Sequence, residues 1–154
     1  MSDDTETGFY TLKGYDLMEE STISTAMEDY LEMIFRCTET TGYIRVNSLA
    51  AKLNVTPPSA SKMAAKLKVQ GLILFEHYGI ITLTEKGREM GEYLLRRHKI
   101  LHQFFCLLNG SENELRQVER LEHFVSPDTV KNLEALLPQL AMWRGSGSGS
   151  QPLL

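Results

Sequence analysis

Apolar residues recur at helical spacing along most of the chain. Those between positions 27 and 35 predict a first helix over residues 25–40, and Thr25 with Glu28 forms a capping box at its start. Proline and glycine then mark where later periodic segments stop. These segments predict helices over residues 47–53, 57–70, 85–108, 112–125 and 127–137.

Two β-rich runs interrupt the helical pattern. Residues 72–75 and 80–83 are joined by a four-residue segment and predict a short hairpin. A helix, a short helix, a tight turn, a basic helix and a hairpin together predict a winged helix-turn-helix. The expected fold is therefore mainly α (an α+β winged helix followed by a helical domain). We expect an acidic arm at 1–22, the winged helix-turn-helix at 23–84, the helical domain at 85–140 and a flexible tail at 141–154.

Composition excludes several classes of protein. The 154 residues are 42% hydrophobic and 23% charged, as in an ordinary globular domain. No apolar run approaches the roughly 18 residues of a membrane span. Two cysteines, Cys37 and Cys106, are too few for a disulfide scaffold or a thiolate zinc site. We therefore expect a cytoplasmic protein.

Charge is segregated along the chain although the net charge is only −4. Residues 1–32 carry nine acids and one base, whereas residues 40–75 carry five bases and no acid. A local cationic surface suits phosphate binding, although a solvated helix face or a protein-interaction module would also explain it. The candidate DNA-contacting residues are exposed positions of the basic segment: Arg45, Thr56, Pro58, Ser59, Ser61, Lys62 and Lys66.

Several acids and histidines lie on otherwise apolar helix faces. Glu122 interrupts an apolar stripe, with Glu119 and His123 beside it, and His98 lies in the stripe of the preceding long helix. A buried carboxylate must be paired, protonated or metal-bound. Taken alone, a histidine such as His98 is more often a hydrogen-bonded core residue than a metal ligand, and an acid on a helix is more often a solvated charge. Together with the Asp29–Glu32 pair, one turn apart on the first helix, they would suit a six-coordinate Mn²⁺ or Fe²⁺.

The chain resembles the DtxR family of metal-dependent repressors, and most closely its manganese transport regulator branch. The resemblance covers about residues 25–140 and rests on AMEDYLEMIF, LAAKLNVTPPSASKMAAKL, ITLTEKG, LLRRHKILHQF and VERLEHF. It implies a homodimer that binds a palindromic DNA operator when loaded with Mn²⁺ and represses manganese uptake genes. The metal ligands that it implies are Asp29, Glu32, His98, Glu119, Glu122 and His123.

Two features depart from the family pattern or qualify it. His102 replaces a carboxylate of many relatives, so it is a candidate extra ligand as well as a candidate core or surface histidine. We also expect the chain to lack the SH3-like third domain of the iron regulators, as the resemblance to the manganese regulators implies.

Three alternatives remain open at this point. The first is a regulator that responds to Fe²⁺ or to several metals. The second is a di-metal carboxylate enzyme, which would require four long helices with Glu-x-x-His on two of them. The third is a metal-independent regulator whose acids pair with Lys or Arg. The sequence contains no Ser/His/Asp triad, phosphate loop or CxxC, so we do not expect an enzyme.

Overall fold

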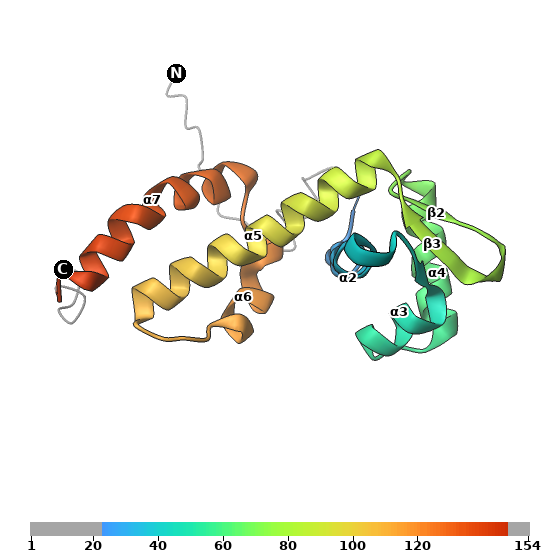
Figure 1. Cartoon of the computed structure of the whole chain (residues 1–154), viewed down its shortest axis with the longest axis horizontal. Helices are drawn as coiled ribbons and strands as arrows, with labels where there is room; N and C mark the ends of the chain where they lie inside the picture. Colours follow the sequence, from blue (N-terminus) through green and yellow to red (C-terminus); the bar gives the residue numbers. More distant parts are fainter. Residues whose placement is uncertain (1–22, 148–154) are drawn as a thin grey trace, which may run out of the picture.

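The computed structural model describes residues 23–147, which form two lobes joined by one long helix (Figure 1). The predicted arm at 1–22 lies outside the described residues. The first lobe contains a small sheet and the helices α2 (Thr25–Thr41), α3 (Val46–Leu53) and α4 (Pro57–Val69). The joining helix and the second lobe are α5 (Glu85–Asn109), α6 (Leu115–Leu121), the 3₁₀ turn η2 (Glu122–Phe124) and α7 (Pro127–Gly145).

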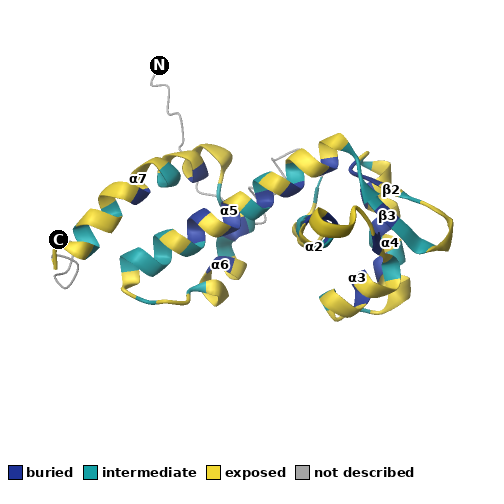
Figure 2. Cartoon of the chain, in the orientation of Figure 1, coloured by how far each residue is buried: buried dark blue, intermediate teal, exposed yellow. Residues whose placement is uncertain are grey.

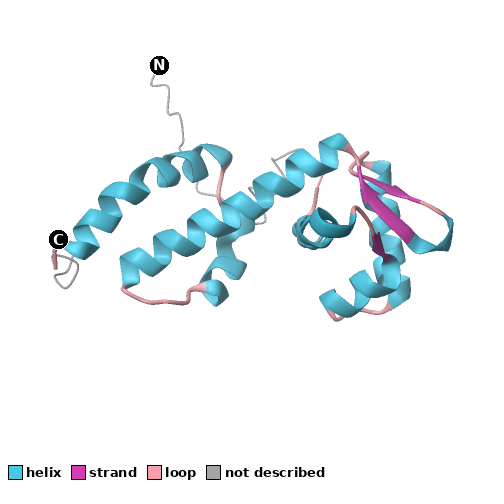
Figure 3. Cartoon of the chain, in the orientation of Figure 1, coloured by secondary structure: helices cyan, strands magenta, loops and turns pink. Residues whose placement is uncertain are grey.

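The sheet has three antiparallel strands in the order β1–β3–β2 (Figure 3). Its outer members are β1 (Ile44–Arg45) and β2 (Ile73–Phe75), and a 3₁₀ turn, η1 (His77–Gly79), leads into the central β3 (Ile80–Leu83). The hairpin was predicted, whereas β1 was not, because two residues are too few to show the alternation of a strand. Together with α3 and α4 the sheet completes a winged helix-turn-helix.

The turn between α3 and α4 depends on two local features. Asn54 ends α3 in the left-handed conformation, at φ 54°. Asparagine adopts this conformation more readily than most residues. Thr56 then caps α4 by accepting from the backbone N–H of Ser59, and proline occupies the first helical position, where no N–H is needed. The predicted tight turn is confirmed.

Each lobe has its own group of buried apolar residues, and α5 contributes to both (Figure 2). In the first lobe α2, α3, α4 and the sheet bury fully covered side chains such as Leu31, Leu49 and Ile81. In the second lobe Ile100 of α5 packs with Val130 and Leu137 of α7. Helix α5 is therefore part of both cores and joins the two lobes.

The helix ends differ from the sequence prediction at two places near the site. The predicted capping box of Thr25 and Glu28 is wrong, because Ser24 caps α2 by accepting from the N–H of Met27 at 3.3 Å. The Glu28 side chain is instead bonded to Arg97 of α5. Helix α6 begins at Leu115 rather than near 112 and stops at Leu121, where η2 begins.

Helix α7 continues through Pro138 to Gly145, so the predicted end at 137 and the predicted tail at 141–145 are wrong. A proline inside a helix removes one backbone hydrogen bond. The last turns are held by Arg144, whose guanidinium donates to the carbonyls of Leu107 and Leu108 at the end of α5. Residues 146–147 of the predicted tail form a turn after α7, and residues 148–154 lie outside the described range. No helix in the described part of the chain is long and apolar enough to cross a membrane.

Candidate metal centre and DNA-reading surface

Two overlapping groups of potential metal ligands lie between α2, α5 and η2. One contains Asp29, Glu122 and His123, and the other contains Glu32, His98 and Glu122. Within each group the ligand atoms lie within 4.8 Å of one another. Because Glu122 belongs to both groups, five of the six predicted metal ligands form one continuous cluster.

Glu122 is the centre of this cluster and is almost fully buried, at 2% exposure. Its Oε2 lies 2.8 Å from Nδ1 of His98, which is itself buried on α5. The hydrogen bond to Glu122 is the main reason why the pKa of His98 is raised above its usual value. A buried carboxylate requires a partner or a metal ion, and in this structure its partner is the imidazole of His98.

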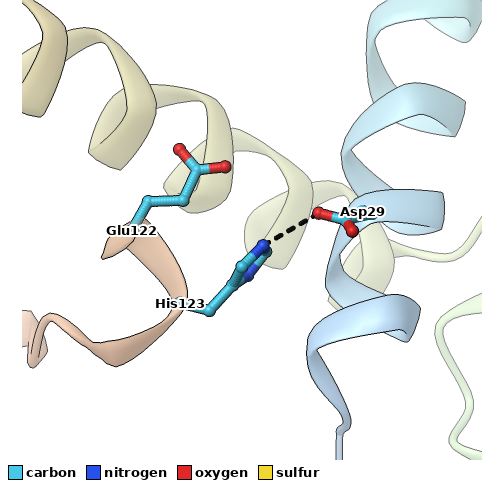
Figure 4. A group of neighbouring side chains, drawn as sticks. All are labelled: Asp29, Glu122 and His123. Carbon is cyan, nitrogen blue, oxygen red and sulfur yellow. Dashed lines mark ion pairs between the residues drawn. The ribbon is translucent and has the colours of Figure 1, made fainter. Parts of the chain in front are cut away.

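His123 lies between two acids of α2. Its Nε2 is 2.9 Å from Oδ1 of Asp29, and the two side chains point toward one another (Figure 4). Its Nδ1 is 3.4 Å from Oε1 of Glu28 and 3.3 Å from Nη2 of Arg97. The hydrogen bonds to Asp29 and then Glu28 raise the pKa of His123 to about 10. An imidazole binds a cation only in its neutral form, so the raised pKa of each histidine makes protons compete with metal here.

Glu119 and Glu32 lie at the edge of the cluster. Oε1 of Glu119 is 3.9 Å from Nδ1 of His98, and Glu119 belongs to neither close group. Burial, followed by the nearby charge of Glu122, raises the pKa of Glu119. Glu32 forms an ion pair with Arg36 one turn later on α2, at 3.2 Å. The structure therefore places Glu119 near the cluster, but outside both groups of close ligands.

The change from α6 to η2 makes the neighbouring side chains of Glu122 and His123 point to different helices. The sequence predicts one helix through Val125, whereas the backbone changes to a 3₁₀ turn at Glu122. Glu122 then contacts α5 through His98, while His123 contacts α2 through Asp29. A 3₁₀ turn is common at the C-terminal end of an α-helix, and here it lets two consecutive residues contact different helices.

The donor set fits a hard or borderline divalent cation. It consists of carboxylate oxygens and imidazole nitrogens without a thiolate, which suits Mn²⁺ or Fe²⁺ better than a soft ion. In octahedral coordination with bonds of about 2.1 Å, neighbouring donors lie about 3.0 Å apart and opposite donors about 4.2 Å apart. The separations within each group reach 4.8 Å at most, so small side-chain movements would place either group around one ion.

Arginine pairing accounts for little of this negative charge. Among the described residues, the ion pairs of Asp29, Glu119 and Glu122 are all formed with histidines. Arg97 is buried at 4% exposure and bonds to Glu28, which sequence reasoning did not include in the site. Nothing in the sequence distinguishes Arg97 from its neighbour Arg96, which pairs with Glu134 of α7 instead.

His102 belongs to neither group of close ligands among the described residues. Its Nε2 accepts the backbone N–H of Glu114 at 3.3 Å, just before α6, and lies 3.5 Å from Sγ of Cys106. These contacts favour the structural interpretation of this histidine over that of an extra ligand.

The predicted DNA-contacting residues lie at the N-cap of α4, along α4 as far as its last turn, and on β1. Ser61 is partly buried and the other six are exposed. Exposed Lys62 and Lys66 lie on α4 one turn apart, while the helix buries Ala60, Ala64 and Leu67 against the core. This arrangement leaves the polar face of α4 exposed to solvent.

Two further features of this lobe bear on nucleic-acid binding. Lys68, one of the five bases of the cationic segment, donates to the carbonyl of Phe75 at 3.4 Å, which joins α4 to the wing. At the tip of the wing Tyr78 is 92% exposed in the left-handed conformation, at φ 70°. The wing thus presents an aromatic ring to solvent beside the cationic helix.

Comparison with known protein families gives two adjacent matches. The model described as "Iron dependent repressor, N-terminal DNA binding domain" matches residues 22–81. The model described as "Iron dependent repressor, metal binding and dimerisation domain" matches residues 84–142. The cluster described above lies across both matches, because Asp29 and Glu32 fall in the first and the other ligands in the second.

Curated relatives agree with these matches. The HTH-type transcriptional regulator MntR of Geobacillus kaustophilus (strain HTA426) is 39% identical over 113 residues, which cover 73% of this chain and 80% of that protein. MntR of Lysinibacillus sphaericus (strain C3-41) is 36% identical, with 71% of this chain and 92% of that protein covered.

Solved structures with similar folds include the manganese regulator SloR, at 30% identity and a TM-score of 0.64. ScaR with bound Zn²⁺ follows at 29% identity and a TM-score of 0.63. In both comparisons 73% of this chain is covered, and it spans about half (53%) of the other chain. The two family matches and the curated relatives show that the chain belongs to the iron-dependent repressor family.

Proposed function

We propose that this protein is a Mn²⁺-activated, dimeric transcriptional repressor that binds a DNA operator and controls metal uptake, chiefly of manganese. The observation that carries the proposal is the position of Glu122, which is buried and shared by two ligand groups, one joining α2 to η2 and the other joining α2 to α5 and η2. Relatives named MntR and a solved manganese regulator support the choice of metal. The family is one of repressors, and the proposal includes no enzymatic step.

The proposed ligands are Asp29, Glu32, His98, Glu119, Glu122 and His123. A divalent ion bound there supplies positive charge that balances the clustered carboxylates. Asp29 and Glu32 lie on α2, which also packs against α3, α4 and the sheet. Ligation of both would hold the DNA-reading lobe against α5 and η2, and so fix the orientation of α4.

The proposed DNA contacts follow from exposure and charge. Thr56, Pro58, Ser59 and Ser61 lie at the start of α4, where they can reach base edges in the major groove. Lys62, Lys66 and Arg45 can neutralise phosphates. In a two-fold dimer the two α4 helices would contact half-sites about 34–36 Å apart, which implies a palindromic operator. DNA binding also implies a location in the cytoplasm.

The test is the affinity for DNA at fixed salt with and without Mn²⁺, using operators selected from a random pool by the Mn²⁺-loaded protein. We expect Mn²⁺ to tighten binding by a factor of roughly 5–150, the usual range of coupling between two sites. His98→Ala should abolish this response while the dimer stays folded. An unchanged affinity with Mn²⁺ would contradict the proposal.

A parallel titration distinguishes the metals. Fe²⁺ suits the same oxygen and nitrogen donors, so a regulator of Fe²⁺ or of several metals is the nearest alternative. Titrating DNA affinity against Mn²⁺, Fe²⁺, Co²⁺ and Zn²⁺ identifies the activating ion. Activation by Fe²⁺ at lower concentration than by Mn²⁺ would favour that alternative.

A further inference from the structure

Arg97 is a buried charge that the proposed metal site does not use as a ligand. It is 4% exposed and lies on α5 next to His98. Its Nη1 donates to Oε2 of Glu28 at 3.0 Å, and its Cζ lies 6.0 Å from the ring centre of Tyr93. A buried arginine is costly unless its partners are well arranged, so its position requires an explanation.

The two consecutive acids of α2 approach His123 from opposite sides of its ring. Asp29 lies 2.9 Å from Nε2, whereas Glu28 lies 3.4 Å from Nδ1. Of the two, only Asp29 belongs to a group of close ligands, whereas Glu28 forms an ion pair with Arg97. Arg97 is therefore paired with the acid that lies outside the groups of close ligands.

Nδ1 of His123 has a hydrogen-bond partner whether or not it carries a proton. As an N–H it can donate to Glu28, and as a lone pair it can accept from Nη2 of Arg97 at 3.3 Å. A histidine that binds metal through one nitrogen usually donates its other N–H to a carboxylate, which fixes the orientation of the ring. Glu28 is placed to be that carboxylate, and Arg97 holds it there.

We propose that Arg97 and Glu28 form a positioning pair that fixes the ring of His123 so that Nε2 faces the metal. Neither residue is itself a ligand. The assignment rests on the proposed function, since it concerns the same metal site. It adds that α2 is joined to α5 through an ion pair that also orients a ligand of η2.

The first test measures Mn²⁺ affinity by competition with a chelating dye, using the full chain. Glu28→Ala and Arg97→Met should each weaken binding about 10–100-fold, the usual effect of removing a partner of a ligand. The double variant should be no weaker than the weaker single variant, because both residues act through His123. Arg96→Met is the matched control, since Arg96 pairs with Glu134, away from the cluster. Its affinity should stay within about twofold of the original.

The second test distinguishes positioning from general destabilisation. In protein labelled with ¹⁵N-histidine and loaded with Zn²⁺, the spectrum of His123 should show metal at Nε2 and a proton on Nδ1. Glu28→Ala should weaken or remove this pattern; because the change leaves buried Arg97 without its carboxylate, circular dichroism of the same variant checks that the fold is kept. An unchanged pattern and unchanged Mn²⁺ affinity in both variants would overturn the assignment alone. Failure of the original protein to bind Mn²⁺ would instead overturn the proposed function.

Discussion

Glu122 is the residue on which both groups of ligands depend. Glu122→Gln keeps the size of the side chain and removes its charge. Because the carboxylate serves both groups, we expect Mn²⁺ affinity to fall by more than the roughly 10–100-fold typical of an outer partner. Isothermal titration checks this, with exposed Glu92→Gln of α5 as the control. Equal affinities of the two variants would place the ion elsewhere.

His102 tests the opposite expectation. Since it accepts the N–H of Glu114 and contacts Cys106, His102→Ala should leave Mn²⁺ affinity within about twofold of the original. It should lower the free energy of unfolding by about 1 kcal/mol, the usual value of one hydrogen bond. Titration and denaturant unfolding measure the two effects. A large loss of affinity would make His102 a ligand after all.

Gly87 of α5 lies directly against the backbone of the segment between α4 and β2. A Cβ on Gly87 would lie 1.8 Å from the carbonyl oxygen of Leu72, which belongs to the backbone and cannot rotate away. Gly87→Ala should therefore destabilise the protein by about 1–3 kcal/mol, as overpacking of a core does. Thermal unfolding should show a decrease of about 2–4 °C per kcal/mol.

Gly145→Ala is the matched control for this change. Gly145 is also helical, at the end of α7, and a Cβ there would have no neighbour within 4 Å. We expect its melting temperature to stay the same or to rise slightly, because alanine loses less entropy than glycine in a helix. A similar decrease in both variants would show that the contact with Leu72 is not the cause.

The elements that follow a regular pattern could be predicted from the sequence, whereas those that depend on a distant partner could not. Glu122 and His98 stood out because polar side chains interrupted apolar stripes, and both are buried as expected. The rule that proline ends a helix failed at Pro138. The turns after it are held by Arg144, which donates to the carbonyl of Leu107 at the end of α5. They also failed at Glu28, where Arg97 competes with the capping role. In each case a tertiary contact outweighed a local preference.

At the scale of the whole molecule, α5 connects the metal cluster to the wing. It begins directly after β3, carries His98 near its middle and packs against α7 near its end. A cation that binds one arrangement of the lobes better than another shifts the population toward that arrangement. DNA that prefers the same arrangement must strengthen metal binding by the same factor. This coupling would be measured as the change in DNA affinity caused by metal, and the cationic face of α4 is the surface proposed to bind the DNA.

Salt dependence identifies the lysines that meet phosphate. Each neutralised phosphate adds about 0.9 to the slope of log Kobs against log salt concentration. Lys62→Ala and Lys66→Ala, both on the exposed face of α4, should each reduce the slope of the Mn²⁺-loaded protein by about 0.9. Lys131→Ala, exposed on α7 in the other lobe, should not change it. Because loss of a charge outside the interface leaves the slope unchanged, unaltered slopes in both α4 variants would mean that a different surface contacts the DNA backbone.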